Sequence, residues 1–97
     1  MRTTRISVFI MTLADILRQE AKSTLLTDIP WLPERVVDCV RACGKYRIIC
    51  DTHIKEVDKS AVPNRYYYPI KQWAEQQGFH VRDEYYPSGV RLIAITL

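Results

Sequence analysis

The sequence predicts an α+β fold in which three helices pack on a small, mainly antiparallel sheet that ends in a C-terminal β-hairpin. Three observations support this prediction. Apolar residues recur at helical spacing in the first half of the chain, two strand-like runs flank a Pro-Ser-Gly turn near its end, and isolated glycines and prolines separate these segments. The simplest packing for this order is a helical layer on one face of the sheet.

Length and composition indicate one small globular domain. A chain of 97 residues fits a single domain, 1–97, because domains cluster near about 100–150 residues. The 47% of hydrophobic and 26% of charged residues are typical of globular proteins and exclude an intrinsically disordered chain. The net charge of +3 favours acidic partners only mildly, because Asp and Glu are scattered among the Lys and Arg.

The N-terminal segment and the cysteines bear on localisation. The apolar run Ile6–Ile10 resembles the start of a signal peptide, but it is too short and Asp15 follows it. No stretch approaches the roughly 20 apolar residues that a membrane span needs. Three cysteines, an odd number, indicate reduced thiols rather than disulfides. We therefore expect a cytoplasmic protein without membrane contact, in which residues 1–10 form a strand from Arg5 to Ile10 or a poorly ordered extension.

The first helix is predicted over Leu13–Leu25. Thr12 suits its N-cap and Asp15 occupies its third position, as in a capping box. Apolar residues then recur at helical spacing, at Leu13, Ile16, Leu17 and Ala21.

The second helix is predicted to open at Pro33, where the missing N–H costs nothing, and to stop at Gly44. Its predicted buried stripe consists of Val36, Val37, Val40 and Cys43. A strand, Tyr46–Cys50, should follow directly.

The second half should contain a loop, a helix and a hairpin. Residues 51–64 are polar and without periodicity, which is typical of an irregular loop. A third helix is predicted over Pro69–Gln77, and strands Phe79–Tyr85 and Val90–Leu97 should pair around Pro87-Ser88-Gly89. The last strand is apolar on both faces over much of its length, so we expect a central strand that helices cover.

Soft metal ligands and acid–base residues are present, but in patterns that favour other interpretations. Cys39, Cys43, Cys50 and His53 could supply four zinc ligands, yet their spacing matches no zinc finger and buried free cysteine is common. His53 and His80 have acidic neighbours but no nucleophile at a supporting spacing, and no glycine-rich phosphate loop occurs. We therefore expect a protein that is not an enzyme and has no metal or cofactor.

Aromatic residues interleaved with basic ones predict a binding surface. Tyr, Trp and Arg are enriched at protein-interface hot spots, while rings beside cations also suit nucleic acid. A winged-helix-like nucleic-acid-binding domain using Arg65, Lys71, Arg82 and Arg91 is the alternative, although the strand expected between its first and second helices falls between the second and third. Some tyrosines must also cover the core. The candidate partner-binding residues are Trp31, Arg65, Tyr66, Tyr67, Tyr68, Pro69, Lys71, Arg82, Tyr85, Tyr86 and Arg91.

In its size, its lack of catalytic motifs and its basic, tyrosine-rich composition with an aromatic–proline step at Tyr68-Pro69, the chain resembles small phage proteins that redirect host enzymes. Among these it most resembles the anti-RecBCD proteins of lambdoid Salmonella phages. The resemblance implies a modulator in the host bacterial cytoplasm that binds the RecBCD helicase–nuclease and alters its processing of DNA ends. It also implies a contact between Pro69 and a host prolyl isomerase.

Overall fold

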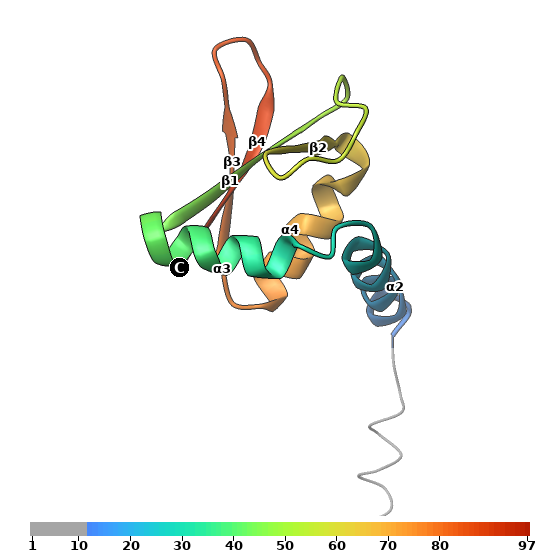
Figure 1. Cartoon of the computed structure of the whole chain (residues 1–97). Coiled ribbons are helices and arrows are strands. Elements are labelled where there is room, and N and C mark those ends of the chain that lie inside the picture. The colour runs from blue at the N-terminus through green and yellow to red at the C-terminus, as the bar shows by residue number, and fades with distance from the viewer. Residues whose placement is uncertain (1–11) are drawn as a thin grey trace, which may run out of the picture.

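The computed structural model describes residues 12–97 as three α-helices and a four-stranded sheet (Figure 1). The strand predicted over Arg5–Ile10 lies outside these residues. In chain order the elements are α2 (Leu13–Asp28), α3 (Leu32–Cys43), β1 (Lys45–Asp51), β2 (Ala61–Pro63), the 3-10 helix η1 (Asn64–Tyr66), α4 (Tyr67–Gln76), β3 (His80–Tyr85) and β4 (Arg91–Thr96). None of the helices in this range is long and apolar enough to cross a membrane.

The strand order in the sheet is β2-β1-β4-β3. β4 pairs antiparallel with both β1 and β3, whereas β2 runs parallel to β1. The predicted α+β fold, with its mainly antiparallel sheet and C-terminal hairpin, is therefore confirmed. The short strand β2 lies within the stretch 51–64 that was predicted to be irregular, and its three residues are too few to show strand periodicity.

The helix ends follow their local sequence signals. The Thr12 hydroxyl accepts a hydrogen bond from the backbone N–H of Asp15 at 3.1 Å, so the predicted capping box forms. α3 begins one residue before Pro33 and ends at Gly44, whose φ of 80° lies in the left-handed region that glycine adopts without strain. α4 begins at Tyr67, two residues before the predicted start at Pro69, because η1 leads directly into it.

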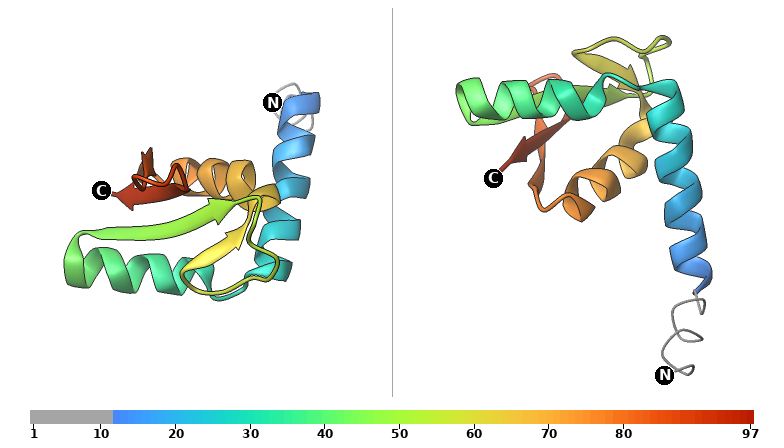
Figure 2. Two further views of the ribbon diagram at one scale, coloured as in Figure 1. Left: turned by 90° about the horizontal axis from the view of Figure 1, so that it is seen from above. Right: turned by 60° about the horizontal axis from the view of Figure 1, so that its bottom comes forward.

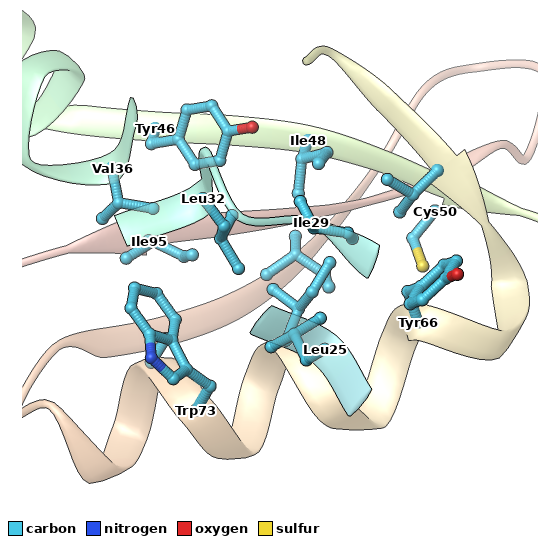
Figure 3. Packing of buried hydrophobic residues seen from close by; sticks show 14 of the residues in the cluster. Leu25, Ile29, Leu32, Val36, Tyr46, Ile48, Cys50, Tyr66, Trp73 and Ile95 are labelled. Carbon is cyan, nitrogen blue, oxygen red and sulfur yellow. The ribbon is translucent and has the colours of Figure 1, made fainter. Parts of the chain in front are cut away.

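The hydrophobic core lies between the inner face of the sheet and the helices (Figure 3). Residues of β1 alternate, so that Tyr46, Ile48 and Cys50 face inward. The predicted buried stripe of α3 is corrected at two positions: Val37 and Cys43 are exposed, because the helix turns them away from the sheet. The principal side chains of the core are Leu25, Ile29, Leu32, Val36, Val40, Tyr46, Ile48, Cys50, Tyr66, Ile70, Trp73, Ile93 and Ile95.

β4 is the predicted central strand and is buried on both faces. Its inward residues Ile93 and Ile95 belong to the core, but the outward residues Leu92 and Ala94, although buried, do not. Among the described residues, helices therefore cover one face of β4, and the prediction that helices cover the strand holds for that face.

Candidate functional site

The helix α2 presents apolar side chains to solvent. Leu13 is 79% and Leu17 63% exposed, and the neighbouring Ile16 is also exposed. Their spacing of three and four residues places them along one side of the helix. Within α2 only Leu25 is buried, and Figure 2 shows the first turns extending beyond α4 and the sheet. This α2 ridge, formed by Leu13, Ile16 and Leu17, has no cover within residues 12–97.

A groove runs beside this ridge, between α2 and the start of α4. It consists of two hollows of about 300 Å³ and 310 Å³, both lined by Leu17, Ala21 and Pro69. Tyr68, 69% exposed, lines the groove from α4. This α2–α4 groove is open, mostly apolar and continuous with the α2 ridge through Leu17.

A hydrogen-bonded cluster borders one end of the α2–α4 groove. The Tyr66 hydroxyl donates to a carboxylate oxygen of Asp28 at 2.8 Å and accepts from Arg65 at 3.3 Å. The Arg65 guanidinium also lies 4.7 Å from the centroid of the Tyr66 ring. This network ties the C-terminal end of α2 to η1, so it fixes the spacing of the two groove walls.

A second polar cluster, on the sheet side of α4, is built around Tyr67. The Tyr67 hydroxyl donates to Asp83 Oδ2 at 2.5 Å and accepts from Lys71 Nζ at 3.0 Å, while Lys71 Nζ lies 3.7 Å from Asp83 Oδ1. Arg91 stacks 3.5 Å from the Tyr67 ring centroid and donates to Asn64 Oδ1. Burial and the bond to Asp83 raise the pKa of Tyr67, and the bond to Tyr67 raises that of Lys71. The Tyr67 cluster therefore joins α4 to the hairpin.

The predicted partner-binding residues lie in different parts of the structure. Tyr66 and Tyr67 are buried and belong to the core, although Tyr66 also lines one hollow of the α2–α4 groove. Lys71 and Arg91, two of the four cations expected for the nucleic-acid alternative, contact Tyr67 within the Tyr67 cluster. By contrast, Arg65, Tyr68 and Pro69 come together at the α2–α4 groove.

The remaining predicted contacts lie elsewhere. Tyr85 and Tyr86 are exposed at the end of β3, where the chain enters the hairpin turn. Trp31 is half-buried and packs against the core at the start of α3. Arg82 points outward from β3, away from the core. These four residues and the α2–α4 groove do not form one continuous site.

The four candidate zinc ligands do not converge. Cys50 is buried in the core on β1, where burial raises its thiol pKa to about 11, whereas Cys43 is exposed on α3. His53 instead contacts Asp51, with 2.9 Å between Nδ1 and Oδ2. In the part of the chain that the structure describes, no three His, Cys, Asp or Glu side chains are grouped to hold a metal ion.

Sequence reasoning missed the functional interest of α2. The recurrence of Leu13, Ile16, Leu17 and Ala21 identified the helix, and such a stripe is usually buried against the core. Nothing in the local sequence shows that the first three residues of this set extend past the sheet.

No family model, curated protein or solved structure matches the chain. The surfaces described above are therefore the basis for a functional proposal.

Proposed function

We propose that this chain is a non-catalytic binding protein that attaches to a larger host enzyme through the α2 ridge and the α2–α4 groove, and thereby inhibits or redirects that enzyme. The observation that carries the proposal is the exposure of Leu13 and Leu17 on an extending helix, directly beside Tyr68 and Pro69. Soluble domains seldom expose contiguous apolar patches of this kind unless another surface covers them.

The energetics favour a partner over solvent. Fully covering one large apolar side chain contributes about 1.5–3 kcal/mol. Covering the exposed parts of Leu13, Leu17 and Tyr68 therefore contributes about 5 kcal/mol in total before the costs of association are subtracted. Arg18 and Gln72 line the same groove and supply the polar rim that protein interfaces typically have.

The host enzyme that we propose is the RecBCD helicase–nuclease. The support for this partner is the resemblance to the anti-RecBCD proteins of lambdoid Salmonella phages, which implies altered processing of DNA ends in favour of phage recombination. A host prolyl isomerase is proposed as a second partner through Pro69, which is half-buried in the groove wall and follows the exposed Tyr68. Both proposals place the action of the protein in the bacterial cytoplasm.

The test is biolayer interferometry with the immobilised chain and purified RecBCD. We expect wild type to bind, and Leu17→Glu to weaken binding at least about tenfold, because a carboxylate would be buried in an apolar contact. Val37→Glu is the matched control, since Val37 is also an exposed apolar residue but lies on α3, away from the groove. In the same assay with a purified host prolyl isomerase, Pro69→Ala should abolish the binding of the isomerase to the immobilised chain.

The outcomes separate the two levels of the proposal. If wild type does not bind RecBCD at micromolar concentrations, the assignment of this partner is wrong. If RecBCD binds but Leu17→Glu and Val37→Glu behave alike, the partner stands and the groove is not its docking site.

A further inference from the structure

The outer face of the sheet carries a regular arrangement of charges that the proposed function does not use. Strand register places side chains in three rows across β1, β4 and β3. The rows are Lys45–Thr96–His80, Arg47–Ala94–Arg82 and Ile49–Leu92–Glu84. Because alternate residues of a strand face the same side, all nine point away from the helices.

Long charged side chains cover the middle of this face. Leu92 and Ala94 are almost fully buried although they lie outside the core cluster. In the strand register Ala94 lies between Arg47 and Arg82, and Leu92 lies between Ile49 and Glu84, so long side chains flank both residues on either side. The cationic groups of Arg47 and Arg82 remain accessible, because these side chains are 57% and 60% exposed.

The charges of this face do not cancel. Glu84 contacts Arg47 at 2.9 Å, Arg82 at 3.3 Å and Lys45 at 3.5 Å, so one carboxylate faces three cations. Partial burial would raise the pKa of Glu84, but the hydrogen bond from Arg47 and the charge of Lys45 outweigh it and hold the pKa below its usual value. The outward carboxylate of β1, Asp51, lies at the far end of that strand from Lys45 and contacts His53. The three rows therefore hold a surplus of two positive charges.

We propose that this cationic face, formed by Lys45, Arg47 and Arg82, binds the phosphodiester backbone of double-stranded nucleic acid without reading its sequence. The three cations come from β1 and β3, on either side of β4, and their charged groups converge on the carboxylate of Glu84, so they form one compact cluster. A compact cluster of three cations that outnumbers its one carboxylate suits a densely charged polyanion, and guanidinium groups pair well with phosphate oxygens.

The composition of the face favours a duplex over other anionic partners. None of the nine positions in the three rows is Phe, Tyr or Trp. Single strands are bound largely by stacking bases on aromatic rings, and protein interfaces are anchored by buried Tyr and Trp. The cationic face has Thr96, Ala94 and Leu92 of β4 at its centre, so it provides neither stacking rings of Tyr, Phe or Trp nor a Tyr or Trp anchor. This inference does not rest on the proposed function, because α4 and the α2–α4 groove lie on the other side of the sheet.

The test is fluorescence anisotropy with a labelled 20-base-pair duplex of arbitrary sequence and the full-length protein in about 50 mM salt, where non-specific contacts are strongest. We expect a micromolar dissociation constant. The logarithm of the association constant should fall linearly with the logarithm of the salt concentration, with a slope of about −2 to −3, as for two to three phosphate contacts. Arg82→Gln should weaken binding about tenfold and reduce the magnitude of the slope by about one. Glu84→Gln should tighten binding, because it removes the carboxylate that repels phosphate.

The pair Arg82→Gln and Glu84→Gln separates recognition from structure, because both changes break the same ion pair. Opposite effects on affinity support the proposal, whereas loss of binding in both variants overturns it. Arg41→Gln is the control for net charge, since Arg41 is exposed on α3, and an equal loss there would also overturn it. Three results would show that the face is not a duplex-binding surface. These are the absence of duplex binding, tighter binding of a single strand than of the duplex, and displacement of the duplex by polyglutamate as efficiently as by unlabelled duplex. Circular dichroism melting confirms that every variant is folded.

Discussion

The hydroxyl of Tyr67 offers the most direct test of how α4 is held to the hairpin. Tyr67→Phe removes the hydroxyl but keeps the ring on which Arg91 stacks, so only the bonds to Asp83 and Lys71 are lost. Hydrogen bonds to charged groups contribute about 1.5–3 kcal/mol each. The side chains of Asp83 and Lys71 remain 29% and 25% exposed, so solvent weakens both contacts. We expect a net loss of about 1.5 kcal/mol in the free energy of unfolding.

Urea unfolding followed by the fluorescence of the buried Trp73 measures this loss. The slope of the free energy of unfolding against urea concentration should not change. The melting temperature should fall by about 6–12 °C, the shift expected for a domain of this size. Tyr85→Phe is the matched control, because Tyr85 is 63% exposed and its hydroxyl makes no hydrogen bond within the described residues. If Tyr67→Phe lies within about 0.5 kcal/mol of wild type, the Tyr67 cluster does not hold α4 in place.

The same comparison has a defined pH dependence. Burial first, and then the hydrogen bond to Asp83, raise the pKa of Tyr67 above its ordinary value of 10.0. A group with a raised pKa in the folded state stabilises the fold below its unfolded pKa and loses that contribution as pH rises through the folded value. The difference in stability between wild type and Tyr67→Phe should therefore stay constant from pH 7 to 9 and shrink above pH 10.

Three further predictions address other parts of the chain. Thr12→Ala removes the N-cap of α2 and should cost about 1 kcal/mol of local helix stability, seen as faster amide exchange in the first turn with little change in melting temperature. Mass-spectrometric labelling at pH 8 should modify the exposed Cys43 first and Cys50 last, because Cys50 is buried and has a thiol pKa of about 11. Ile48→Ala removes a fully buried side chain from the core and should destabilise the protein by about 2–5 kcal/mol in urea unfolding.

Features governed by neighbouring residues were predictable from the sequence. The capping box at Thr12, the left-handed stop at Gly44 and the C-terminal hairpin depend on contacts within a few positions. The start of α4 was misplaced because the 3-10 turn before it has no distinct sequence pattern. The strand β2 depends on its pairing with β1, about twelve positions away, so its three residues show no signal of their own.

The tyrosine run 66–68 shows why the site was predictable only in part. Three consecutive tyrosines give no pattern from which to choose the buried ones. Their orientation depends on distant partners, because Tyr66 bonds to Asp28 and Tyr67 to Asp83, which are 38 and 16 positions away. Once these two rings are fixed, the helix turns Tyr68 outward, into the wall of the α2–α4 groove. The buried tyrosines thus determine the direction in which the exposed one points.

The two proposed surfaces can be separated because the core lies between them. The α2–α4 groove belongs to the helical side, and the cationic face belongs to the outer side of the same sheet. Leu17→Glu adds a negative charge far from the outer face, and Arg82→Gln removes a positive charge without touching the groove. A protein with both functions could hold an enzyme on one side and duplex nucleic acid on the other. Each variant should then weaken one interaction and spare the other, whereas coupled losses would mean that a single surface accounts for both.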